Sequence, residues 1–115
     1  MSLFRSILGK IKQNDKIEVL SAVDFKSKIS GSDVQLVDVR TAQEYENWHI
    51  EGAINVNFYS NSFEKEMEKF DKMKPVFLYC RSGHRSRLAS YKLASKGFNS
   101  LYDLKGGILK WDYHQ

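Results

Sequence analysis

Residues 75–86 read PVFLYCRSGHRS and join a strongly apolar run to a basic loop. The apolar run, 75–80, is typical of a strand that is buried on both faces of a parallel sheet. The residues that follow, 83–96, have the length of a helix, and Gly97 is a typical helix C-cap. The stretch therefore predicts a buried strand, a tight loop that turns at Gly83, and a helix.

The rest of the chain alternates in the same way between short strands and helices. Ser21 and Thr41 each precede an acidic residue by three positions, which is the spacing of a helix N-cap. Strand–helix alternation predicts an α/β fold with a central, mainly parallel sheet and helices on both faces. We expect strands at 17–20, 34–39, 53–56, 75–80 and 100–102, and helices from 21, at 41–47, 62–72 and 83–96, and around Trp111.

Length and composition exclude several classes of protein. The chain has 115 residues, which fits one small domain, and its 42% hydrophobic and 28% charged content excludes a mostly disordered chain. No apolar run approaches the roughly 18–20 residues that span a bilayer, so we expect no transmembrane segment. A single cysteine excludes a disulfide framework and a multi-cysteine metal site, and we expect no metal and no cofactor.

The predicted organisation is an N-terminal amphipathic arm, residues 1–16, followed by one domain, residues 17–115. The arm has apolar residues on one helical face, which fits packing on the domain, with membrane-surface binding as the alternative. It lacks the features of an export signal, and the cysteine requires a reducing compartment, so the expected location is cytoplasmic. The length fits a monomer or a dimer, and the sequence does not decide between them.

The net charge of +4 is unevenly distributed. Residues 17–71 hold five basic and eleven acidic residues, whereas residues 72–102 hold seven basic residues and no acidic one. The basic stretch surrounds the only cysteine, Cys80, and favours a local site for small anions; a solvated basic face is the alternative. No reading helix or aromatic RNA motif is present, so nucleic acid is not expected as a partner.

The loop after the buried strand has the composition of an anion-binding site that carries a nucleophile. Backbone amides at a strand-to-helix junction are unpaired and attract anions. Cys80 precedes this junction, with Arg81, Arg85 and Arg87 nearby, and each of these features favours the thiolate over the thiol. The alternative interpretation of Cys80 is a buried structural cysteine.

Four segments, which occur in order over about residues 17–113, resemble the rhodanese family of sulfurtransferases. The active-site pattern of that family is Cys-x-x-Gly-x-Arg-Ser. The similar segments are CRSGHRS at 80–86, LVDVR at 36–40 with Glu44 and Tyr45, HIEGAIN at 49–55, and LKGG at 104–107 with Trp111.

The resemblance implies a single rhodanese-like domain that moves a sulfane sulfur through a persulfide on Cys80. The donor would be a small anion, such as thiosulfate, or a persulfide, and the acceptor a thiol, cyanide or a thioredoxin-like protein. Cys80 is then the catalytic nucleophile. The substrate-binding loop would comprise Arg81, Ser82, Gly83, His84, Arg85 and Ser86, whose backbone amides cradle the sulfur.

Side chains around this loop have supporting parts in the implied chemistry. Arg81 and His84 would tune the choice of donor, and Arg85 would either bind anions or pin the loop. Asp38 and Arg40 end a neighbouring strand and are expected to support the loop as a pair. Three other residues, His49, Trp48 and Trp111, are expected to be structural.

Two alternatives to a sulfurtransferase are open. A regulatory or sulfur-relay module can use the same fold without turnover. A cysteine-dependent phosphatase is disfavoured because phosphatase loops place an arginine six residues after the cysteine, whereas Arg85 lies five residues after Cys80. A shorter loop fits a sulfur atom better than a phosphate group.

Overall fold

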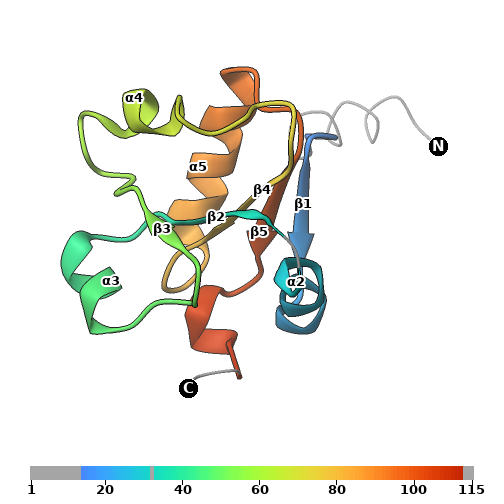
Figure 1. The fold of residues 1–115 in the computed structure, drawn as a ribbon, viewed down its shortest axis with the longest axis vertical. Helices are drawn as coiled ribbons and strands as arrows, with labels where there is room; N and C mark the ends of the chain where they lie inside the picture. Colours follow the sequence, from blue (N-terminus) through green and yellow to red (C-terminus); the bar gives the residue numbers. More distant parts are fainter. Residues whose placement is uncertain (1–13, 32, 113–115) are drawn as a thin grey trace, which may run out of the picture.

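The computed structural model describes residues 14–31 and 33–112. The predicted arm, residues 1–16, falls almost entirely outside the described residues. Five strands form one parallel sheet in the order β1-β5-β4-β2-β3 (Figure 1). The strands are β1 (Ile17–Leu20), β2 (Gln35–Asp38), β3 (Ile54–Asn55), β4 (Val76–Tyr79) and β5 (Leu101–Leu104). The helices are α2 (Ala22–Ile29), α3 (Ala42–Asn47), α4 (Phe63–Met67), α5 (His84–Ser95) and the 3₁₀ helix η1 (Gly107–Lys110).

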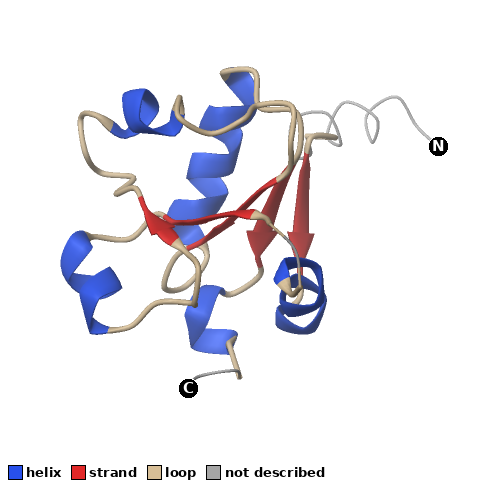
Figure 2. Ribbon diagram, viewed as in Figure 1, coloured by secondary structure: helices blue, strands red, loops and turns tan. Residues whose placement is uncertain are grey.

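Helices cover both faces of the sheet, and each face has its own apolar core. Helices α4 and α5 lie on one face of the sheet (Figure 2). Their regions contribute Phe63, Met67 and Leu93 to a buried cluster. On the other face, α2 and the segment after η1 contribute Phe25 and Trp111 to a second cluster. The predicted α/β architecture, with a parallel sheet between two helical layers, is confirmed.

The central strand β4 shows why Cys80 is placed where it is. All four residues of β4 are buried, and the strand pairs with β2 on one side and β5 on the other. Its side chains alternate, with Leu78 and Cys80 in the α5-side cluster and Phe77 and Tyr79 in the opposite cluster. The predicted doubly buried strand is confirmed, and it delivers the cysteine to the carboxyl end of the sheet.

Polar caps begin two of the helices as the sequence predicts. The hydroxyl of Ser21 accepts a hydrogen bond from the amide of Asp24 at 3.2 Å. At Thr41 the capping box is complete, because the hydroxyl accepts from the amide of Glu44 while the Glu44 carboxylate accepts from the amide of Thr41. These caps satisfy amides that the first helical turn leaves without partners.

The structure differs from the predicted elements in three places. The helix expected at 62–72 ends at Met67, and the chain then turns, held by the side chain of Gln35, which donates to the carbonyl of Asp71 and accepts from its amide. The terminal helix is a single 3₁₀ turn that ends before Trp111. The last strand runs to Leu104, two residues beyond the prediction, because it pairs with β1 along its full length.

Among residues 14–31 and 33–112, none of the helices combines the length and the apolar character that a bilayer crossing requires.

Candidate active site

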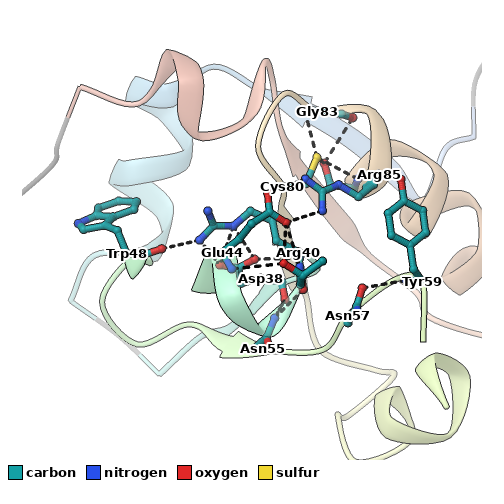
Figure 3. Close-up of polar contacts among 12 residues, drawn as sticks. Asp38, Arg40, Glu44, Trp48, Asn55, Asn57, Tyr59, Cys80, Gly83 and Arg85 are labelled. Atoms are coloured by element: carbon teal, nitrogen blue, oxygen red, sulfur yellow. Dashed lines mark hydrogen bonds and ion pairs between the residues drawn. The ribbon is translucent and has the colours of Figure 1, made fainter. Parts of the chain in front are cut away.

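The loop of residues 80–86 wraps its backbone around the sulfur of Cys80. The sulfur accepts hydrogen bonds from the amide of Gly83 at 3.1 Å and from the amide of Ser86 at 3.3 Å (Figure 3). The hydroxyl of Ser86 lies 3.5 Å from the same sulfur. Amides that donate to sulfur stabilise its negative charge, so the geometry suits a thiolate. Cys80 itself is fully buried, at 0% exposure.

Two glycines allow this tight loop. Gly83 has a φ of +101°, a conformation that favours glycine, and it directly precedes α5. Gly107 packs beneath the loop with a φ of +63°, and a β-carbon there would lie 2.6 Å from the carbonyl oxygen of Cys80 and within collision distance of the Arg81 carbonyl. The two amides after Gly107 bind these carbonyls. The amide of Ile108 donates to the carbonyl of Cys80 at 3.0 Å, and the amide of Leu109 donates to the carbonyl of Arg81 at 3.1 Å.

Behind the sulfur, a buried carboxylate anchors the first turn of α5. Asp103, on β5, accepts from the hydroxyl of Ser86 at 2.5 Å and from Nε of Arg87 at 2.9 Å. Burial raises the pKa of Asp103, although both donors act in the opposite direction. The network ties the cysteine loop to the neighbouring strand.

Arg85 pins the loop to α3. Its two terminal nitrogens donate to the two carboxylate oxygens of Glu44 at 2.7 and 3.0 Å, and its guanidinium lies over the ring of Tyr59 (Figure 3). Hydrogen bonds from Arg85 lower the pKa of Glu44 to about 2, with the Thr41 cap adding to the effect. Glu44 in turn raises the pKa of Arg85. The guanidinium is therefore committed to a protein carboxylate.

Asp38 and Arg40 form the buried pair that the sequence predicts. Nε and Nη2 of Arg40 donate to the Asp38 carboxylate at 2.7–3.1 Å, and Nη2 also donates to the carbonyl of Trp48. The side chain of Asn55 donates to the carbonyls of Asp38 and Arg40 and closes the turn after β2. Arg40 therefore links the carboxyl end of β2 to the segment that follows α3.

The remaining predicted residues divide between the outer surface of the loop and the core. Arg81, Ser82 and His84 are exposed on the outer side of the loop. Nδ1 of His49 lies 2.8 Å from the carbonyl of Tyr45, and the imidazole stacks on the Tyr45 ring, consistent with a structural role. Both tryptophans pack with the second apolar cluster.

Charge around the loop is largely compensated. Five of the seven basic residues in the 72–102 stretch form ion pairs with acidic side chains. Most of the positive charge that the sequence places near Cys80 is therefore neutralised by acidic partners. The pairs are Lys72–Glu68, Arg85–Glu44, Arg87–Asp103, Lys92–Glu64 and Lys96–Glu64. The structure therefore assigns the stabilisation of the sulfur to backbone amides more than to free cationic side chains.

Three residues at this site have structural tasks that the sequence does not reveal. Sequence reasoning assigns Glu44 to a helix cap and a family motif and Gly107 only to a family motif, and it gives Asp103 no role. The acid-free stretch 72–102 is the one available signal for Asp103, since its seven basic residues can find acidic partners only elsewhere in the chain.

A cavity of about 380 Å³ lies beside the loop, between α3 and η1. Its polar lining includes Arg40, Glu44 and Arg81, and its apolar lining includes Trp48 and Leu109. Within the described ranges, no group of three or more His, Cys, Asp and Glu side chains is placed to hold a metal ion.

The fold and the site define an α/β domain that holds one cysteine in an amide-lined loop at the end of its central strand. The sequence model of the rhodanese-like domain family matches residues 21–114. The chain belongs to the rhodanese-like domain family.

Three proteins of different names are similar to this chain over 71–96% of its length. The chain is 35% identical over 82 residues to the thiosulfate sulfurtransferase GlpE of Coxiella burnetii, covering 71% of this chain and 75% of that protein. It is 32% identical to the adenylyltransferase and sulfurtransferase UBA4 of Meyerozyma guilliermondii, covering 96% of this chain. It is 34% identical to the tRNA uridine(34) hydroxylase of Wigglesworthia glossinidia brevipalpis. The chain spans 27% of the length of UBA4 and 30% of the hydroxylase.

Solved structures agree on the fold. An uncharacterized protein from Saccharomyces cerevisiae is 32% identical with a TM-score of 0.70, covering 83% of this chain and 90% of the other. A rhodanese-like domain protein from Staphylococcus aureus has a TM-score of 0.74 at 23% identity, covering 85% and 96%. The second likeness concerns the fold alone.

Proposed function

We propose that this protein is a sulfurtransferase that carries a sulfane sulfur as a persulfide on Cys80. The observation that carries the proposal is the pair of amides, from Gly83 and Ser86, that donate to the Cys80 sulfur. They stabilise the thiolate that attacks and the anionic persulfide that results. The 35% identity to a named thiosulfate sulfurtransferase supports the same reaction.

The reaction has two steps, each a displacement at sulfur. The Cys80 thiolate attacks the outer sulfur of thiosulfate, the sulfur–sulfur bond of the donor breaks, and sulfite leaves with the bonding electrons. A thiolate or cyanide then attacks the terminal sulfur of the persulfide, and Cys80 leaves as the thiolate. Because Cys80 is fully buried, part of the surrounding structure must move for a donor to reach its sulfur. A reduced thiol suits the cytoplasm.

Two observations disfavour a phosphatase. The arginine that a phosphatase would use to bind phosphate, Arg85, has both terminal nitrogens on Glu44 instead. The cysteine loop closes on a single sulfur atom, with the amide of Ser86 already hydrogen-bonded to it. The protein would have to break the Arg85 pair and widen the loop to hold a phosphate group.

The test is to incubate the protein with thiosulfate and measure its intact mass. Since Cys80 is the only cysteine, a gain of one sulfur atom assigns the persulfide without digestion. Added cyanide should then remove the sulfur as thiocyanate, and Cys80→Ala should neither gain nor transfer sulfur. Hydrolysis of a phosphate ester by a protein that forms no persulfide with any sulfane donor would overturn the proposal. Persulfide formation without discharge to any acceptor would favour a relay module.

A further inference from the structure

One nitrogen of Arg40 has no partner among the residues that the structure describes. Nε and Nη2 donate to the Asp38 carboxylate, and Nη2 also donates to the carbonyl of Trp48. Every side-chain hydrogen bond of Arg40 comes from these two nitrogens, and Nη1 donates to no described residue (Figure 3). The side chain is only 4% exposed. An enclosed guanidinium nitrogen without an acceptor would be costly, so the position of Nη1 matters.

The direction of Arg40 Nη1 follows from the hydrogen bonding of the enclosed atoms and from the cavity that Arg40 lines. Every fully enclosed side-chain nitrogen or oxygen in the described ranges has a hydrogen-bond partner, so Nη1 must reach open space. Arg40 lines the cavity of about 380 Å³ between α3 and η1. A water molecule accounts for roughly 30 Å³ of the liquid, so the cavity has room for an organic molecule of about ten heavy atoms.

The charges in this cavity leave a positive excess. Asp38 balances Arg40, and Arg85 balances Glu44. Arg81 also lines the cavity, and within residues 14–31 and 33–112 it forms no ion pair. The cavity thus offers an anionic group one unpartnered donor, from a largely buried side chain, and one uncompensated cation.

The rest of the lining is apolar and lies against the active-site loop. Trp48, Ile108 and Leu109 supply apolar surface on the two sides of the cavity. The amide of Leu109 donates to the carbonyl of Arg81, the residue that directly follows the nucleophile, so the cavity borders the loop itself. A ligand held here would have an anionic group at one end, an apolar chain, and access to the loop that holds the reactive sulfur.

We propose that this cavity is a carboxylate subsite for an organic thiol that accepts the sulfur. The carboxylate would accept from Arg40 Nη1 and pair with Arg81, and the carbon chain would lie along the apolar lining. The thiolate would attack the terminal sulfur of the Cys80 persulfide, the bond to Cys80 would break, and the product would be an organic persulfide. This assignment rests on the proposed sulfur transfer and names the class of its acceptor.

The acceptor step can be measured alone because the two half-reactions are separate. The protein is first loaded with thiosulfate and freed of excess donor. Loss of the persulfide is then followed by intact mass with mercaptohexanoate or with mercaptohexanol, which differ mainly in the carboxylate. We expect discharge to mercaptohexanoate to be at least about tenfold faster than discharge to mercaptohexanol, which is the effect of one hydrogen bond to a charged group.

Leu109 provides a matched pair of variants, since it lines the cavity and is 58% exposed. Leu109→Glu places a competing carboxylate beside the two arginines, whereas Leu109→Gln has the same shape without the charge. The preference for mercaptohexanoate should disappear in Leu109→Glu and persist in Leu109→Gln. Arg40→Lys keeps a cation beside Asp38 but removes Nη1, and it should also lose the preference if it folds.

The outcomes separate the subsite from the reaction. If no donor forms a persulfide, the proposed function fails. If persulfide forms but discharges equally to both thiols, or if Leu109→Glu and Leu109→Gln behave alike, the subsite fails and the function stands. If Leu109→Glu instead slows only loading by thiosulfate, the cavity holds the oxyanion of the donor, and the acceptor assignment is wrong.

Discussion

Gly107 lies directly beneath the loop of residues 80–86 and offers the sharpest test of how that loop is held. Its φ of +63° is close to the value of about +57° that other residues can adopt at moderate cost. The larger obstacle is steric, since a β-carbon would lie 2.6 Å from the carbonyl oxygen of Cys80, where ordinary contact begins at 3.4 Å. In Gly107→Ala the backbone of the loop must therefore move.

Gly52 is the matched control. It has a less favourable φ of +90°, but a β-carbon there would meet no atom within 4 Å. Gly52→Ala should cost about 1–2 kcal/mol of unfolding free energy through the backbone alone. Gly107→Ala should cost that much and a further ~1–3 kcal/mol of overpacking. In a domain of this size, each kcal/mol lowers the Tm by about 4–8 °C.

The two substitutions should also differ in sulfur loading. Displacing the loop by something near 1 Å would slow persulfide formation on Cys80 by roughly 100-fold, because the amides no longer meet the sulfur. Gly52→Ala should load as fast as the unmodified protein. Thermal unfolding and intact-mass kinetics measure both effects. If Gly52→Ala proves the more destabilising change and Gly107→Ala loads normally, the reasoning that Gly107 supports the loop is refuted.

Two further predictions concern the ion pairs around the site. The pKa of Glu44 is lowered to about 2, so its stabilisation is complete above pH 4.5 and is lost as the pH falls toward 2; Glu44→Gln should flatten the decline of Tm across that window. Parallel Tm curves for both proteins would contradict this. Arg87 and Lys92 have similar side-chain exposure, 43% and 46%, but Arg87 pairs with buried Asp103. Urea unfolding should show a cost of about 1–3 kcal/mol for Arg87→Gln and below about 0.5 kcal/mol for Lys92→Gln, and equal costs would refute the distinction.

Local signals in the sequence account well for the centre of the fold. The run at 75–80 is apolar because β4 is paired on both sides and covered on both faces, so its burial is visible in its composition. The capping box at Thr41 needs only residues within four positions of one another. The position of Cys80 follows from these short-range features, since it directly follows the buried strand.

Contacts between distant segments explain what the sequence could not predict. Arg85 meets Glu44 across 41 residues, and this pairing depends on β4 lying beside β2 in the sheet. Neither residue has a local pattern that reports the strand order. The early end of α4 has a similar cause, because Gln35 holds the turn at Asp71 from 36 residues away. Spacing rules describe one helix or strand at a time, and these residues act between elements.

The strand order also has a consequence for the synthesis of the chain. In the described sheet β1 pairs with β5 alone, so β1 has its partner roughly 80 residues later, about 4–16 s of translation. Until β5 leaves the ribosome, β4 has one open edge and β1 has no pairing at all. The nascent domain therefore has an interval in which apolar strands are open to chaperones or to other chains. Cys80 precedes β5 in the chain, so its loop can take its final shape only after β5 has been made.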